Sequence, residues 1–217
     1  MRRHAKYFYV LFVVIIISFI FWGVGGVGNG KGGRNVATVG GTKISVTQYW
    51  AAYQRAEDSV RDAVGDKFDD KMKQALKMKV LGNLVVNEML YHAAHSEGIT
   101  VTDNELRAAI TSEPAFRQGG GFSRSTYLQV LRMNRITPEQ YESSLRKELL
   151  AEKMRRMIED PIELSPAELA SIPKGSGQTA GTIKNAILEM KRQRALVSFL
   201  EGLKDRMKVT ENPGLIS

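Results

Sequence analysis

Residues 80–110 read VLGNLVVNEMLYHAAHSEGITVTDNELRAAI, and this stretch decides the fold class. Leu81, Leu84 and Val85 recur at intervals of three and four, as on the buried stripe of an amphipathic helix. Gly98 follows this pattern as a helix stop, and Thr102 with Glu105 three residues later forms a capping box. The stretch therefore predicts a long helix over residues 70–96, a short turn and a second helix that begins at 103.

Upstream of this stretch, short apolar runs at 36–39 and 43–45 flank Gly40-Gly41-Thr42. Two short runs around a glycine turn predict a small β-hairpin. Ser45, with Gln48 three residues on, is a second capping box and predicts a helix over 46–64 that ends at Gly65.

Downstream, residues 116–122 (FRQGGGF) predict a glycine loop between two aromatic residues, followed by a short helix that carries Tyr127 and Leu131. Thr137-Pro138-Glu139-Gln140 combines a cap, an N1 proline and an N3 partner, and predicts a helix over 138–159. The chain from about residue 35 onward is thus predicted to be all-α, with one small N-terminal β-hairpin.

Residues 161–181 are predicted to form a linker. Ser165-Pro166-Ala167-Glu168 repeats the helix start signal, but Pro173 cuts that helix short. A last amphipathic helix is predicted over 183–207. We expect its apolar stripe to pack on the helices at 46–64 and 70–96, and Val209 to pair with strand 36–39; the stripe consists of Leu196, Phe199, Leu200, Leu203 and Met207.

The composition excludes several classes of function. The chain has 217 residues, a formal charge of +8 and no cysteine, so disulfides, thiolate zinc sites and cysteine nucleophiles are absent. Basic and acidic residues alternate through 57–73 and 146–160, a pattern typical of solvated helix faces rather than of a nucleic-acid surface. We expect no nucleic-acid partner.

The first residues predict a membrane anchor. Residues 7–27 contain no charge, and as a helix they would extend ~31 Å, close to the ~30 Å hydrocarbon core of a bilayer. Residues 1–6 are basic through Arg2, Arg3 and Lys6, which places the N-terminus in the cytoplasm. A cleaved signal peptide is the alternative, but the run is long and no Ala-x-Ala site follows. Residues 28–34 form a glycine-rich tether.

The ordered series of these elements resembles the SurA N-terminal-like chaperone module, which membrane-anchored peptidyl-prolyl isomerase D also carries. The resemblance covers about residues 35–158 and rests on these stretches: VATVGGTKISVTQYWAAY, VLGNLVVNEMLYHAAHSEGITVTDNELRAAI, PAFRQGGGFS and ITPEQYESSLRKELL. It implies a helical domain over 35–160 that binds unfolded exported or outer-membrane polypeptides.

The chain departs from this family at one place. Larger relatives insert a parvulin isomerase domain before the C-terminal helix, whereas the interval 161–181 contains no histidine and no aromatic residue. No isomerase active-site residue can be assigned to it, so no catalytic residue and no enzyme activity are expected. Residues 182–217 resemble the C-terminal helix and tail that pack back on the module.

Few residues suggest site chemistry. Glu88, His92 and His95 share one helix face and could bind a metal, but no fourth ligand is near, and ordinary interfacial histidines are favoured. The glycine runs match no phosphate-binding motif, so neither a metal nor a cofactor is predicted. Methionines lie on most predicted helices, as core residues or as adaptable contacts. The client-binding candidates cluster around the glycine loop: Phe116, Phe122, Tyr127 and Met133.

These observations predict an ATP-independent holdase on the periplasmic side of the bacterial inner membrane, tethered near the export channel. Two alternatives stay open. One is a peptidyl-prolyl cis-trans isomerase with residual or in-trans activity, and the other is an adaptor subunit for a single membrane partner.

Overall fold

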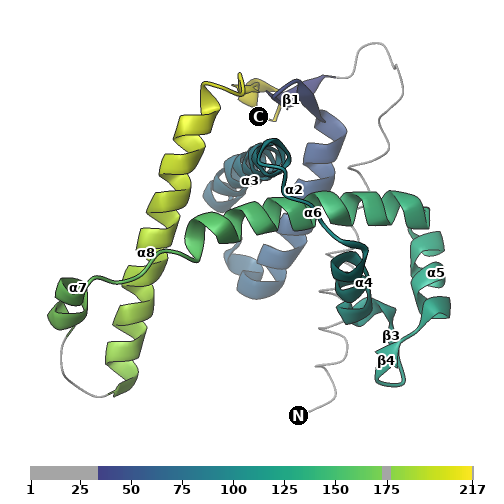
Figure 1. Ribbon diagram of the computed structural model, residues 1–217. Helices are drawn as coiled ribbons and strands as arrows, with labels where there is room; N and C mark the ends of the chain where they lie inside the picture. The colour runs from purple at the N-terminus through teal and green to yellow at the C-terminus, as the bar shows by residue number, and fades with distance from the viewer. Residues whose placement is uncertain (1–33, 173–176, 217) are drawn as a thin grey trace.

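The computed structural model describes residues 34–172 and 177–216, which are mostly helical (Figure 1). The elements follow one another in this order: β1 (Asn35–Val39), β2 (Thr42–Ser45), α2 (Val46–Val64), η1 (Gly65–Lys67), α3 (Asp70–Ser96), α4 (Asp103–Ser112), η2 (Pro114–Phe116), β3 (Arg117–Gln118), β4 (Gly121–Phe122), α5 (Arg124–Met133), α6 (Pro138–Glu159), α7 (Pro166–Ser171), α8 (Gly177–Lys204), β5 (Thr210–Glu211) and η3 (Pro213–Leu215).

The predicted N-terminal hairpin is confirmed. β1 and β2 pair antiparallel, with Val39 opposite Thr42. Gly40 and Gly41 connect them with φ angles of 56° and 88°, the left-handed conformation that a two-residue hairpin turn requires and that glycine adopts without a steric penalty.

Side-chain caps start the helices where the sequence predicts them. Capping boxes form at the starts of α2, α4, α6 and α7, each with a Ser or Thr side chain and a Glu or Gln three residues later. α3 ends in a Schellman motif, because Ile99 N–H donates to Ala94 C=O at 2.9 Å while Gly98 adopts φ 70°.

Within the interval 161–181, the structure forms the short helix that the start signal at Ser165 predicts, and the last helix begins earlier than expected. α7 ends at Ser171, before Pro173, and α8 begins at Gly177 rather than at 183. Lys191 of α8 explains why α7 is held in place: its ammonium group lies 2.8 Å from the Glu168 carboxylate and donates to the Glu163 carbonyl. α7 is therefore docked on α8.

α8 completes the main hydrophobic core. Its Leu196 and Leu203 are buried, and Phe199, Leu200 and Met207 pack against the same cluster. The expected partner surface needs one correction: α8 packs chiefly on α6 and α3 rather than on α2. Ala151 and Met154 of α6 belong to the same buried cluster as Leu196 and Leu203 of α8.

The C-terminal tail returns to the N-terminal hairpin, as expected. β5 pairs antiparallel with β1, which gives a three-stranded sheet of order β2-β1-β5. The pairing begins at Thr210, one residue after Val209. Asn212 N–H donates to Val36 C=O at 2.8 Å, and Ile216 is 2% exposed. Figure 1 shows the tail beside β1, so the two ends of the described chain share one sheet.

A second hydrophobic cluster lies apart from the main core, in a unit that we call the second lobe: α4, η2, β3, β4, α5 and the first half of α6. Its buried residues are Leu106, Ile110, Phe116, Tyr127, Leu131, Ile136, Tyr141 and Leu145. α6 joins the two clusters, because its N-terminal half carries Tyr141 and Leu145 while its C-terminal half carries Ala151 and Met154. In Figure 1, α6 crosses the molecule with the second lobe at one end and α8 at the other.

Within residues 34–172 and 177–216, no helix is long and apolar enough to cross a bilayer. The predicted membrane span over 7–27 and the basic start over 1–6 lie outside the described residues, as does the tether over 28–34 apart from Arg34.

Candidate functional site

The second lobe is built around three aromatic rings. Phe116 packs edge-to-face against Tyr127 and Tyr141, with ring centroids 4.9 and 5.4 Å apart. Tyr127 and Tyr141 also meet, at 5.8 Å. Such pairs contribute about 0.5–1.5 kcal/mol beyond the area that they bury. Burial raises the pKa of both tyrosine hydroxyls above its usual range, so both stay neutral.

The predicted glycine loop is a small β-hairpin. Arg117 pairs with Phe122 and Gln118 with Gly121, while Gly119 and Gly120 turn the chain with positive φ angles. Ser123 N–H donates to Phe116 C=O at 2.7 Å. This hydrogen bond closes the base of the hairpin and anchors its two strands to the buried Phe116.

The structure divides the four predicted contact residues. Phe116 is 0% exposed and Tyr127 is 7% exposed, so both are core residues and cannot meet a partner in this conformation. Phe122 is 39% exposed at the hairpin, and Met133 is 76% exposed at the end of α5. The glycine spacing brings all four into one lobe, but only Phe122 and Met133 remain candidates for contact.

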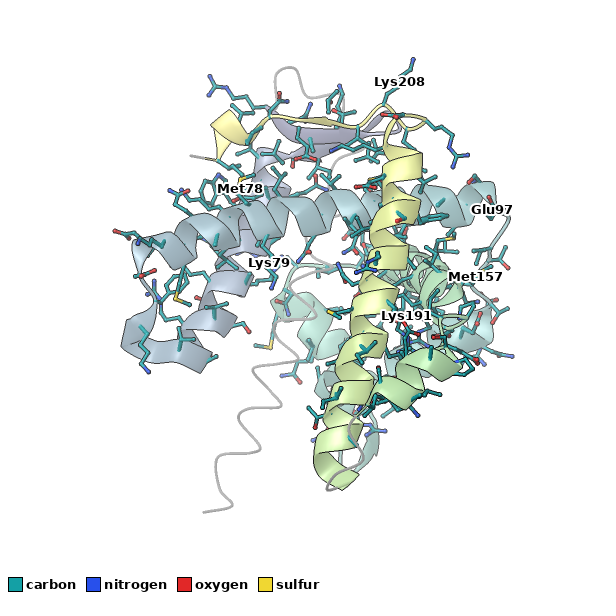
Figure 2. All side chains as sticks on the ribbon, turned by 90° about the vertical axis from the view of Figure 1, so that its left-hand side faces the viewer. Met78, Lys79, Glu97, Met157, Lys191 and Lys208 are labelled. Carbon is teal, nitrogen blue, oxygen red and sulfur yellow. The ribbon has the colours of Figure 1, made fainter. Side chains whose placement is uncertain are left out.

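The structure shows which methionines are core residues and which are exposed, a choice that the sequence left open. Among the described residues the exposed large apolar side chains are mostly methionines: Met78, Met133, Met157 and Met190, beside Phe122, Leu169 and Val197. In the view of Figure 2, Met78 of α3 and Met157 of α6 lie on either side of α8. The sequence does indicate the exposure of Met78, because Met78 does not share the helix face of Leu76 and Val80, which α3 buries.

A buried carboxylate joins the main core to α6. Glu88 of α3 is 8% exposed, and its oxygens lie 2.6 Å from Lys147 Nζ of α6 and 3.4 Å from His92 Nε2. His92 also contacts Thr42 Oγ1 at 3.0 Å. His92 therefore lies at the interface between α3 and the hairpin turn. Within the described residues, no group of three His, Cys, Asp or Glu side chains is arranged to hold a metal.

Two further cations of α6 hold the connection between α3 and α4. Arg146 donates to Val101 C=O at 2.8 Å. Lys153 donates to Thr100 C=O at 2.8 Å and lies 2.6 Å from the Glu105 carboxylate. Lys153, together with the capping bonds from Thr102, lowers the pKa of Glu105 to about 2. The second lobe is thus attached to the main core by polar contacts as well as by the continuous α6.

Comparison with known proteins identifies this arrangement. Residues 1–155 match the model of the SurA-like N-terminal domain family. The chain belongs to this family. The match confirms the resemblance that the capped helices, the hairpin and the glycine loop indicate. It ends within α6, so α7 and α8 lie outside the SurA-like N-terminal domain as that model defines it, although α8 fills the same core.

Curated relatives of this SurA-like chain include proteins named periplasmic chaperone PpiD. The protein from Escherichia coli (strain K12) is 29% identical over 151 residues, which are 67% of this chain and 24% of that protein. The protein from Haemophilus influenzae is 23% identical over 161 residues, 72% of this chain and 26% of that protein. The chain thus spans about a quarter of the length of these relatives.

Proposed function

We propose that this protein is an ATP-independent holdase for unfolded exported or outer-membrane polypeptides. One observation carries the proposal: the exposed apolar side chains of a SurA-like domain are mostly methionines. Flexible thioethers fit many partner shapes, and shallow apolar contacts demand no particular hydrogen bonds. Binding of this kind is weak and promiscuous, which suits a protein that holds many clients and then releases them.

The proposal includes a membrane anchor over residues 7–27, a tether over 28–34 and a domain that extends from 35 to the C-terminal tail in the periplasm. Tethering raises the local concentration of the holdase near emerging clients without any new contact. We expect the mature protein to retain its first residues and to fractionate with the inner membrane. N-terminal sequencing that begins after Gly23 would show a cleaved signal peptide instead.

We propose that the protein itself is not an isomerase. No residue of the chain resembles a parvulin active site, and the described interval between α6 and α8 is occupied by α7. A proline-isomerisation assay on the purified protein separates the two functions. Turnover well above the uncatalysed rate would establish the enzyme and remove this part of the proposal.

The holdase and the adaptor hypotheses predict different crosslinking patterns. A photoreactive residue at Met133, the most exposed of the large apolar side chains that the structure describes, should give a broad distribution of products in cells, because many clients pass over it. The same residue at Gln129, which is exposed on the same helix, should give fewer products. A single product of stoichiometric yield at both positions would favour the adaptor for one membrane partner.

A further inference from the structure

The charged surface of the second lobe differs from that of the rest of the protein. Residues 101–137 contain five arginines and no lysine, whereas the chain as a whole uses both. All five side chains are exposed, and they come from α4, β3, both ends of α5 and the turn before α6: Arg107, Arg117, Arg124, Arg132 and Arg135. We call these five residues the arginine surface.

No carboxylate among the described residues is paired with the arginine surface. None of the five guanidinium groups forms an ion pair with a described residue, and Arg132 donates only to the Leu128 carbonyl. Two acidic residues of the lobe pair with cations of α6, Asp103 with Arg146 and Glu105 with Lys153. The lobe also contains Glu113, Glu139 and Glu142, and none of these three forms an ion pair with the five arginines. The arginine surface is therefore free to attract an external anion.

Arg135 adds an observation from the backbone. α5 ends in a Schellman motif, in which Ile136 N–H donates to Leu131 C=O at 3.0 Å and Arg135 occupies the left-handed position with φ 56°. Glycine is the usual residue there, because a side chain in this conformation lies too close to the following carbonyl oxygen. Strain of this kind at an exposed residue points to a role other than stability.

Each exposed apolar residue of the lobe lies beside arginines. Phe122 is the cross-strand partner of Arg117, so both side chains lie on the same face of the hairpin, and Arg124 follows two residues later. Met133 lies between Arg132 and Arg135 in the chain. Guanidinium groups bind carboxylates through two parallel hydrogen bonds and also stack on aromatic faces. Phe122 with Arg117 and Arg124 forms a first site, and Met133 with Arg132 and Arg135 forms a second. Each site combines an apolar contact with recognition of an acidic group.

The spacing of the two sites indicates the shape of the ligand. α5 separates them with ten residues, a distance of ~15 Å at a helical rise of ~1.5 Å per residue. An extended polypeptide covers ~15 Å with about five residues. A single extended segment could therefore place one acidic and one apolar residue at each site.

We propose that the second lobe binds extended polypeptide segments in which acidic residues alternate with apolar ones, through the arginine surface together with Phe122 and Met133. This inference rests on the proposed holdase function and names the class of client that the lobe prefers. Positively charged segments are repelled from the same surface. Clients with acidic segments are then held at the lobe before purely apolar ones.

The test uses the full chain in nanodiscs of uncharged lipid and three fluorescent peptides of equal length. The first alternates Asp with Leu and Phe, the second replaces each Asp with Asn, and the third replaces each Asp with Lys. Fluorescence anisotropy should give an affinity for the Asp peptide about three- to tenfold above that for the Asn peptide, since each exposed charge pair contributes only modestly to binding. Salt should reduce this preference.

Substitutions of the arginines test which residues give the preference for the Asp peptide over the Asn peptide. Arg117→Gln with Arg124→Gln, and Arg132→Gln with Arg135→Gln, should each reduce it. Lys71→Gln with Lys79→Gln is the charge-matched control, because both lysines are exposed on α3 outside the lobe, and it should leave the preference intact. Arg135→Gly should weaken binding of the Asp peptide while the melting temperature stays the same or rises, since glycine relieves the strained φ.

Three outcomes would overturn the inference. Equal binding of the Asp and Asn peptides, with denatured protein still bound, would remove the acidic preference but leave the holdase function standing. Binding of no peptide and no denatured protein would remove both. If the arginine variants change only co-flotation with phosphatidylglycerol vesicles, the surface recognises lipid phosphate rather than a polypeptide.

Discussion

A chain that ends at Gly181 should lose cooperative unfolding. The missing part contains Leu196 and Leu203, which are 2% and 7% exposed, and Ile216 at 2%. Each fully buried aliphatic side chain contributes about 1.5–3 kcal/mol. The truncation also removes β5 and its hydrogen bonds to β1. Because a domain has a net stability of only ~5–15 kcal/mol, we expect the shortened protein to aggregate, or to melt without a sharp transition by circular dichroism.

Point substitutions on α8 give this expectation a control. Leu196→Ala should lower the free energy of unfolding by about 2–5 kcal/mol, as expected for a large-to-small change in a core. Val197→Ala, at the neighbouring position where the side chain is 42% exposed, should change it by less than about 0.5 kcal/mol. If the chain ending at Gly181 melts as sharply as the full chain, α8 is an independent appendage rather than part of the core.

Phe116→Ala should have the second large effect. Phe116 is 0% exposed and touches both tyrosines of the second lobe, so its loss should cost about 3–5 kcal/mol. Because the lobe has its own cluster, the loss should appear first as faster hydrogen exchange in α4 and α5, with slower exchange retained in α3.

Phe122→Ala is the matched control for this prediction, since Phe122 closes the same hairpin but is 39% exposed. It should change exchange in α4 and α5 only slightly. If Phe116→Ala accelerates exchange equally in α3 and α5, the two clusters unfold as one cooperative unit and the description of a separate lobe is wrong.

The elements that could be predicted from the sequence are those set by local chemistry. The starts of α2, α4 and α6 depend on a cap residue and its partner three residues away, so the sequence contains the whole signal. The turn at Gly40-Gly41 is local in the same sense. Val209 was expected beside strand 36–39, and the pairing starts one residue later, because strand register depends on both partners.

The features that could not be predicted depend on contacts distant in sequence. α8 packs on α6 because of where α6 crosses α3, which no local pattern contains. Phe116 and Phe122 flank the same glycines, and only the fold makes one buried and the other exposed. The start of α7 is a local signal, but its docking on α8 is not, because Lys191, far along the chain, pairs with Glu168.

The arginine surface could be seen in the sequence only as composition. Five arginines without a lysine over residues 101–137 are countable, but ordinary solvated helices also carry such charges. What distinguishes the surface is that Arg146 and Lys153, from another part of the chain, take up the acidic partners Asp103 and Glu105. These two ion pairs join segments that are distant in sequence, so only the tertiary structure shows them.

Aggregation of a chemically denatured outer-membrane protein, followed by light scattering without ATP, tests the central claim most directly. The full chain at near-stoichiometric amounts should delay aggregation. Joint substitution of Met78, Met133, Met157 and Met190 by Gln should weaken this effect, since the four side chains are exposed and Gln keeps the length while removing the apolar contact. If the unsubstituted chain changes neither the aggregation nor the refolding yield of any such client, the protein is not a holdase.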